Sequence, residues 1–460
     1  MQDILERSVD YARKLGADFC DIRYENRQGL NIRVVNDELQ TLSKSARKGV
    51  AVRVSLRGAW GFGSTTALAA KGILEATTEA YAAAKAQARD APRSTYEDLP
   101  ARTGKKRAPV KIHPTSIPEE EKVAFALDLS RAQKVSKAIA SSSSVVAERV
   151  ADYAFVNSVG ASLAWEEVRM AVYAHTVAAE GDRREFSFDF DSRTSGYELV
   201  QGIDPFEMGS RVAKEAQDLL KARQAPAGLK TVVADPYVSG LLAHEVMGHA
   251  SEGDEIVKRR SFLTGKVGKR VGSSLVTLYE DGTFPGGNGT IPFDGEGTPG
   301  HKTQVIREGV YRGYVHSLES AQALNASPTG NGRAQDFTRK IWVRMTNTYF
   351  APGKEAYEEI LEDTKEGILA EKAMSGIEDP VGGGFECQVL RGREIKNGRL
   401  GKLYRSFALT GKALEILKSV DRVSREFSVE GGTCGKGEED WVPVSSGGPY
   451  MRAKIVVGGG

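Results

Sequence analysis

The strongest constraint on the fold is a set of three long strand-like segments that follow one another closely. They span residues 144–157, 161–179 and 184–191. A turn at Asn157–Gly160 joins the first two segments, and Glu180–Asp182 precedes the third. Short turns between consecutive strands are typical of antiparallel pairing. The segments therefore predict an antiparallel sheet in the N-terminal half of the chain.

Helices and shorter strands are expected around this sheet. Residues 50–56 alternate between apolar and small or polar side chains, as in a half-buried strand. Breaks at Gly29, Asn36–Asp37 and Gly58 favour a meander of short antiparallel strands in this region. A long connection is expected over residues 91–117. Helical spacing predicts helices at about residues 2–15, 67–88, from Pro118 onward, 205–222, 354–364 and 411–419.

A short segment rich in proline and glycine, residues 224–228, marks the predicted domain boundary. The chain that follows contains more glycine and shorter strands. We therefore predict an α+β protein of two domains. The N-terminal domain, residues 1–225, has an antiparallel sheet with helices and divides into subdomains at about 1–90 and 117–225. The C-terminal domain, residues 226–460, is mostly β and carries a distorted metal-binding helix.

The composition is that of a globular protein with no need of a polyanionic partner. Of the 460 residues, 40% are apolar and 27% are charged, and the formal charge is +2. This near-neutral charge favours neither nucleic acid nor a membrane surface as a partner, and no segment reaches the roughly 18 apolar residues that cross a bilayer. The N-terminus lacks the features of a signal peptide, and the three cysteines are widely spaced. We expect a cytoplasmic protein.

Residues 244–249, with the sequence HEVMGH, predict the chemistry most specifically. They follow a buried strand at about residues 229–234 and lie in a helix that begins at Asp235–Pro236 and ends near Gly253. Two imidazoles and a carboxylate on one helix are the usual components of a catalytic zinc site. The histidines act as ligands, and the carboxylate acts as a base for water.

The spacing of the two histidines requires a distorted helix. In a regular α-helix, His244 and His249 would point about 140° apart, because each residue turns the helix by about 100°. A π-type bulge would bring the two side chains to within about 50° of each other. We expect the distortion at Gly248, which has no β-carbon.

A catalytic zinc ion normally has three protein ligands and one open position. Reasoning from the residues alone leaves the third ligand open, with Glu252 and Cys434 ahead of the others. Cys434 lies in a glycine-rich segment, residues 431–437, that is expected to be a loop. Cys20 and Cys387 are expected in the core, and His175 is expected to be structural. The candidates for the third ligand are Glu252, His301, His316 and Cys434.

Several further motifs give the chain a clear family resemblance. The residues 244–254, HEVMGHASEGD, are accompanied by four shorter motifs and by a closing segment from Val442 to Pro449. In this order they resemble the TldD/PmbA family of metallopeptidases, in particular its metal-bearing TldD-like branch. The four shorter motifs are residues 295–300 (GEGTPG), 329–333 (TGNGR), 344–349 (RMTNTY) and 432–436 (GTCGK).

The resemblance implies an enzyme and its site. Zinc, with iron as the alternative metal, would be bound by His244, His249 and Cys434, and Glu245 would act as the general base. The substrates would be small or unfolded peptides, and the protein would form a homodimer or a heterodimer with a homologue that lacks the metal motif. Glu252 would then contact one of the histidines.

Two other interpretations compete with this one. A family member can act as a non-catalytic interaction or scaffold subunit, although such a subunit has no need of an intact ligand set. An amidohydrolase acting on a non-peptide amide would use the same residues. For Arg344, Asn347 and the loop 329–333 we consider a role in orienting a peptide backbone, and for Arg344 also an ion pair with a buried carboxylate.

Overall fold

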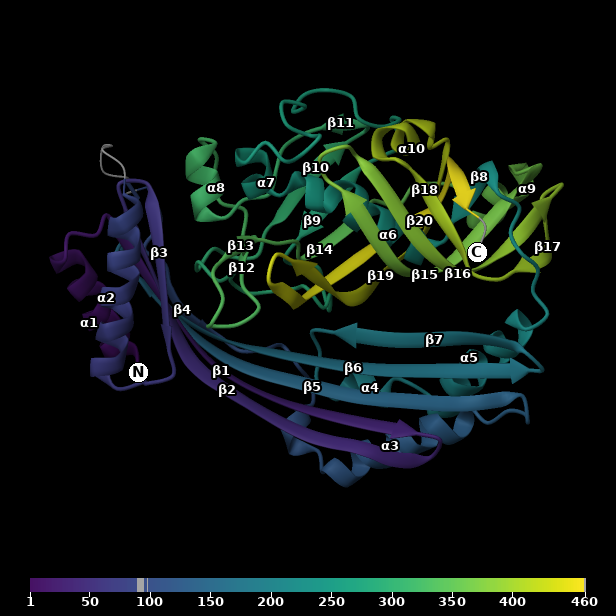
Figure 1. Cartoon of the computed structure of the whole chain (residues 1–460), viewed down its shortest axis with the longest axis horizontal. Helices are drawn as coiled ribbons and strands as arrows, with labels where there is room; N and C mark the ends of the chain where they lie inside the picture. The colour runs from purple at the N-terminus through teal and green to yellow at the C-terminus, as the bar shows by residue number, and fades with distance from the viewer. Residues whose placement is uncertain (89–94, 97, 459–460) are drawn as a thin grey trace.

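The computed structural model describes residues 1–88, 95–96 and 98–458. Two sheets follow each other along the chain, one formed by strands between residues 19 and 193 and the other by strands between residues 228 and 458. The predicted α+β class, with an antiparallel N-terminal sheet and a mostly β C-terminal part, is confirmed. In Figure 1 the N-terminal sheet curves beneath the C-terminal part of the molecule. The exact domain bounds stay a prediction.

The N-terminal sheet has seven strands in the order β3-β2-β1-β5-β6-β4, and β7 pairs with β6. Helices α3, α4 and α5 lie on the face that is turned away from the C-terminal part, and α1 and α2 lie at one end of the sheet (Figure 1). The strands are β1 (Phe19–Val35), β2 (Glu38–Leu56), β3 (Ala59–Thr65), β4 (Thr103–Lys106), β5 (Ile139–Asn157), β6 (Ser162–Glu180) and β7 (Arg183–Arg193). The helices are α1 (Gln2–Lys14), α2 (Ala70–Gln87), η1 (Pro114–Ser116), α3 (Glu119–Ala132), α4 (Glu198–Gln201) and α5 (Pro205–Leu219).

The strands of this sheet are longer than the predicted meander. Gly29 does not break β1, because the strand pairs continuously with β2 and β5 on either side of it. Asn36 and Asp37 do form a hairpin turn, with φ angles of 52° and 68°. The predicted connection 91–117 lies partly outside the described residues. Its described part contains β4, which pairs in parallel with β6 and was not predicted.

The C-terminal sheet contains a closed ring of strands. Its order is β11-β10-β9-β14-β20-β18-β16-β15-β8, and β8 also pairs with β20. Strands β8, β15, β16, β18 and β20 therefore enclose a core. The strands are β8 (Gly228–Ala234), β9 (Leu278–Asp281), β10 (Lys302–Arg307), β11 (Val310–Tyr311), β14 (Asn347–Phe350), β15 (Glu366–Asp379), β16 (Gly384–Lys396), β17 (Arg399–Tyr404), β18 (Phe407–Lys412), β19 (Arg422–Lys436) and β20 (Glu439–Gly458). A separate pair is formed by β12 (Gly332–Arg333) and β13 (Trp342–Val343).

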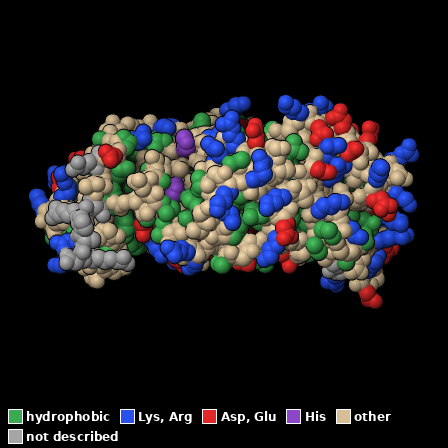
Figure 2. Space-filling model, turned by 90° about the horizontal axis from the view of Figure 1, so that it is seen from above, with side chains coloured by type: hydrophobic (Ala, Val, Ile, Leu, Met, Phe, Trp, Pro, Cys, Tyr) green, Lys and Arg blue, Asp and Glu red, His purple; other side chains and the backbone are tan. Residues whose placement is uncertain are grey.

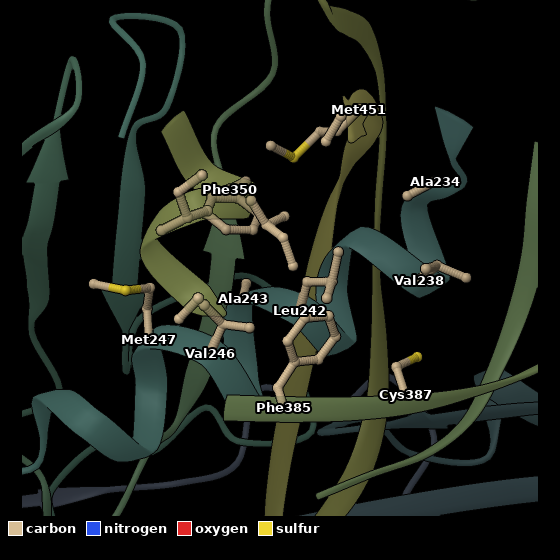
Figure 3. Packing of buried hydrophobic residues seen from close by; sticks show 14 of the residues in the cluster. Ala234, Val238, Leu242, Ala243, Val246, Met247, Phe350, Phe385, Cys387 and Met451 are labelled. Atoms are coloured by element: carbon tan, nitrogen blue, oxygen red, sulfur yellow. The ribbon is translucent and has the colours of Figure 1, made fainter. Parts of the chain in front are cut away.

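The first turns after β8 are packed against the core of this ring. Val238 and Leu242 are buried in the same cluster as Phe385 and Cys387 of β16, and Figure 3 shows these side chains close together. The expected core positions of Cys387 and Cys20 are confirmed, with exposures of 1% and 0%. The helical segments of this half are α6 (Pro236–Leu242), η2 (Ala243–Gly248), η3 (His249–Ser251), α7 (Gly253–Val257), α8 (Leu318–Ala323), α9 (Tyr357–Asp363) and α10 (Ala413–Ser419).

Charged side chains of both signs are distributed over the surface, and the side chain of His175 is also exposed there. Figure 2 shows basic side chains along most of one face, with acidic side chains among them. His175 is exposed on β6 and stacks on Phe186 of β7, with ring centroids 5.5 Å apart. Among the described residues, no helix is long and apolar enough to span a membrane.

Candidate metal centre

The helix that carries the HEVMGH residues starts where the sequence predicts. Asp235 caps α6, and its carboxylate accepts hydrogen bonds from the backbone N–H of Val238 at 2.8 Å and of Lys372 at 2.9 Å. Pro236 occupies the first turn, where its missing N–H costs nothing. The second bond ties the start of the helix to β15. The position of the helix is thereby fixed relative to the ring of strands.

The predicted distortion of the helix is present. Residues Ala243–Gly248 form a π-helical turn, followed by a 3-10 turn at His249–Ser251. This wider turn brings the rings of His244 and His249 together, with centroids 5.0 Å apart and planes at 85°. Gly248 lies at its end, where an added Cβ would lie 2.0 Å from Sδ of Met345. An alanine at this position would therefore force the side chain of Met345 to shift.

Cys434 lies 185 residues after His249 in the chain but beside it in the structure. Its Sγ lies 3.4 Å from Nε2 of His249. One ligand atom each from His244, His249 and Cys434 lies within 4.8 Å of the other two, and all three residues are buried. The expectation of a loop at residues 431–437 is wrong: most of this segment is strand β19, with Cys434 paired opposite Val442. Its small residues allow close packing, since a Cβ on Gly431 would lie 2.0 Å from the carbonyl oxygen of Ser192.

The chemistry of these three side chains fits a divalent metal ion such as zinc. Nδ1 of His244 is buried and has no hydrogen-bond partner among the described residues, and such an orphaned nitrogen is a natural donor to a metal. Burial alone would raise the pKa of the Cys434 thiol, but positive charge on His249 and His244 outweighs burial and holds this pKa well below its usual range. The site therefore favours the thiolate, which is the form that binds metals.

The other candidate ligands lie elsewhere. Glu252 contacts the far nitrogen of His249, with Oε2 3.5 Å from Nδ1. His301 is exposed, and His316 is buried with its Nδ1 3.2 Å from the hydroxyl of Ser320. Neither histidine belongs to the cluster around Cys434. Of the four candidates, the geometry joins Cys434 to the two histidines.

Glu252 is held in place by a lysine that the sequence reasoning missed. Nζ of Lys436 lies 2.8 Å from Oε2 of Glu252 and 2.7 Å from Oδ1 of Asp254. Burial would raise the pKa of Glu252, but Lys436 and His249 lower it to about 2. A carboxylate that contacts Nδ1 of His249 orients the ring so that Nε2 faces Cys434. Lys436 lies two residues after Cys434, so the same strand supplies both groups.

Glu245 lies beside the cluster, against strand β15. Its Oε2 is 4.0 Å from Nε2 of His249. Gly376 makes room for it, because a Cβ at that position would lie 2.4 Å from Cγ of Glu245. Glu378 lies next to Glu245, and one ligand atom each from Glu245, Glu378 and His249 lies within 4.8 Å of the other two. Burial raises the pKa of Glu245 to about 7; the two histidines oppose this rise, and a hydrogen bond with Glu378 adds to it.

Comparison with known proteins identifies the family. Three models of the PmbA/TldA metallopeptidase family match the chain: domain 1 over residues 20–84, the central domain over 112–220 and the C-terminal domain over 227–459. The chain belongs to this metallopeptidase family. The resemblance inferred from the sequence motifs is therefore confirmed.

Proteins similar to this family member are found in archaea. A metalloprotease of Methanocaldococcus jannaschii is 33% identical over 96% of this chain and 97% of its own length. A zinc metalloprotease TldD homolog of Saccharolobus solfataricus is 26% identical over 98% of this chain and 99% of its own length. The crystal structure of TldE from Thermococcus kodakarensis has the same fold, with a TM-score of 0.77 at 20% identity, and covers 99% of this chain and 100% of that one.

Two residues considered for substrate contact in this family member are instead buried and bind other parts of the chain. Arg344 is 0% exposed, pairs with Glu439 at 2.8 Å and donates to the carbonyl oxygen of Cys434. The alternative of an ion pair with a buried carboxylate is therefore correct. Asn347 is also buried and donates to the carbonyl oxygen of Asp281 at 2.6 Å. No sequence signal links Arg344 to Glu439, which lies 95 residues further along the chain.

Proposed function

We propose that this chain is a zinc-dependent peptidase that hydrolyses small or unfolded peptides. In this proposal His244, His249 and Cys434 bind the metal, and Glu245 is the general base. The observation that carries the proposal is the convergence of one thiol and two imidazoles within 4.8 Å, with a carboxylate beside them. Zinc is favoured because nitrogen and sulfur donors suit it and because one archaeal relative is named a zinc metalloprotease. Iron is the alternative metal.

In the proposed reaction, Glu245 and Glu252 have different roles. A bound zinc ion supplies Lewis-acid polarisation of the peptide carbonyl and lowers the pKa of water. Glu245 accepts the proton of the attacking water and then delivers it to the departing amine. Burial raises the pKa of this carboxylate above its ordinary value, which favours its role in accepting and returning the proton. Glu252 holds the ring of His249 in the orientation that Cys434 requires.

The fold of the site also supports a role for the main chain in substrate binding. Strand β15 passes Glu245 at Gly376. Its pairing with β8 covers only residues 368–370, whereas its pairing with β16 continues to Asp379. A peptide in extended form could pair with such a strand through main-chain hydrogen bonds, which give affinity with little side-chain selectivity. This supports unfolded peptides as substrates.

We also propose that the protein acts in the cytoplasm as a dimer. The three free cysteines, none in a disulfide, suit a reducing compartment. Relatives named as TldD homologues and the similar fold of TldE support pairing either with a second copy or with a homologue that lacks the metal motif. The scaffold alternative does not require the buried ligand set.

A metal assay combined with a peptide digest tests the proposed function. The purified chain should contain about one zinc ion per chain and cleave a mixture of unfolded peptides. Glu245→Gln should keep the zinc and lose cleavage, whereas His249→Ala should lose both. A wild-type protein that binds zinc but cleaves no peptide, alone or mixed with a metal-less homologue, would favour the scaffold or amidohydrolase alternatives. Glu245→Gln at full activity would remove Glu245 as the base.

A further inference from the structure

A small cavity between the two sheets is lined by four arginine side chains. Its volume is about 50 Å³. The walls come from the N-terminal strands β1, β5 and β6 and from C-terminal segments around residues 291–295, 333–334 and 442–443. The arginines are Arg23 of β1, Arg149 of β5, Arg169 of β6 and Arg333 of β12.

Within the described ranges of the chain, one of these four arginines has a charged partner. Arg169 pairs with Glu167 and also donates to the carbonyl oxygen of Asn288 at 2.8 Å. The described part of the chain places no carboxylate oxygen within 4.0 Å of the guanidinium groups of Arg23, Arg149 or Arg333. Three positive charges therefore face the cavity without an ion pair.

The neutral contacts of these three arginines leave much of their hydrogen-bonding capacity unused. Arg23 donates to the carbonyl oxygen of Asp336 at 3.0 Å, and Arg333 donates to that of Met345. Arg149 has one long contact of 3.4 Å to the hydroxyl of Tyr153, and its Nε is buried without a partner among the described residues. Arg23 and Arg333 are each only 6% exposed. Buried guanidinium groups are normally paired, because removing a charge from water is costly.

The acidic groups that line the cavity do not balance its arginines. Glu25 lies 3.4 Å from Arg27 and also acts electrostatically on Arg149 and Arg23, and Glu167 pairs with Arg169. The carboxylate of Asp294 accepts hydrogen bonds from three backbone N–H groups, those of Glu296, Thr298 and Gly332. The cavity therefore keeps an excess of positive charge.

We propose that this cavity binds a small oxyanion through Arg23, Arg149 and Arg333. The planar guanidinium group matches the paired oxygens of a phosphate or a carboxylate. A volume of about 50 Å³ suits such an ion rather than a peptide, since a cavity needs about 10–15 Å³ to hold a single water molecule. Because the walls come from both sheets, the bound ion connects the N-terminal sheet to the C-terminal domain. The site does not depend on the proposed peptidase activity.

Titration calorimetry of the full-length, exhaustively dialysed chain tests this site. Inorganic phosphate and acetate are titrated separately at constant ionic strength set by potassium chloride, and thermal unfolding is measured at each anion concentration. We expect one bound anion per chain and a melting temperature that rises by about 1 to 3 °C at ten times the Kd. The anion that binds more tightly identifies the source as a phosphate or a carboxylate.

Two variants and a control decide the outcome. Arg149→Gln and Arg333→Gln should each weaken binding about ten-fold or more, because each removes a charge-assisted hydrogen bond. Arg149 makes little other contact, so Arg149→Gln keeps the test valid if Arg333→Gln fails to fold. Arg193→Gln is the matched control, because Arg193 is 57% exposed and pairs with Asp191 outside the cavity. The proposal is overturned if neither anion binds or raises the melting temperature, or if Arg149→Gln binds as tightly as the control.

Discussion

Gly376→Ala should separate the proposed general base, Glu245, from the proposed metal ligands. A Cβ at this position would lie 2.4 Å from Cγ of Glu245 and 2.8 Å from its Cδ and Oε1. Non-bonded carbon atoms are comfortable at about 3.5 to 4.0 Å, so a displacement of roughly 1 Å or more is needed. The backbone of β15 cannot easily supply it, because Gly376 is paired opposite Cys387 of β16. The carboxylate of Glu245 must therefore move.

The expected effect is on turnover and not on the metal. All three nearest atoms to the new Cβ belong to Glu245, and none belongs to His244, His249 or Cys434. Loss of a positioned general base lowers the rate by about 10²- to 10⁴-fold. The metal content should stay at the wild-type level. Because Gly376 does not have a positive φ angle, alanine brings no backbone strain of that kind.

Peptide cleavage and metal content measured on the same sample provide the assay. Gly432→Ala is the matched control, because it lies on β19 near Cys434 and its Cβ would meet nothing within 4 Å. We expect this control to cleave at close to the wild-type rate. Wild-type cleavage by Gly376→Ala would refute the placement of Glu245 as the base, and a loss of metal in that variant would refute the separation of base and ligands.

Three further predictions concern the surroundings of the centre. Lys436→Met should destabilise the metal-free protein by about 3 to 5 kcal/mol in urea unfolding, because it leaves Glu252 buried without its partner; a change below 1 kcal/mol would contradict this. The pKa of Glu252 is lowered from 4.5 to about 2. Its ionised carboxylate therefore contributes roughly 3 kcal/mol to the free energy of unfolding above pH 4.5, and this contribution is lost as the pH falls toward 2. Glu252→Gln should not show this loss, and parallel curves of unfolding free energy against pH for the two proteins would disprove it. Gly248→Ala should lower the free energy of unfolding by about 1 to 3 kcal/mol, because its Cβ would lie 2.0 Å from Sδ of Met345. An unchanged free energy of unfolding would show that Met345 moves freely.

Local signals in the sequence predicted the helix and its distortion. Asp235 and Pro236 mark the helix start through capping chemistry, which depends only on neighbouring residues. The five-residue spacing of His244 and His249 requires a wider turn, and the π-helical turn supplies it. These properties follow from the geometry of a single helix.

Contacts between distant segments could not be predicted in the same way. Gly376 faces Glu245 only because of the register between β15 and β16, which is set after an irregularity between Ala373 and Ser375. Cys434 was one of several candidate ligands until the pairing of β19 with β20 placed it beside His249. Such registers depend on the packing of the whole sheet.

The most direct test of the metal centre is X-ray absorption spectroscopy at the zinc edge. For the wild-type protein we predict two nitrogen scatterers at about 2.0 to 2.1 Å from His244 and His249 and one sulfur scatterer at about 2.3 Å from Cys434. Cys434→Ser should lose the sulfur signal and bind zinc more weakly. A zinc spectrum with no sulfur scatterer, or one that Cys434→Ser leaves unchanged, would contradict the proposed centre.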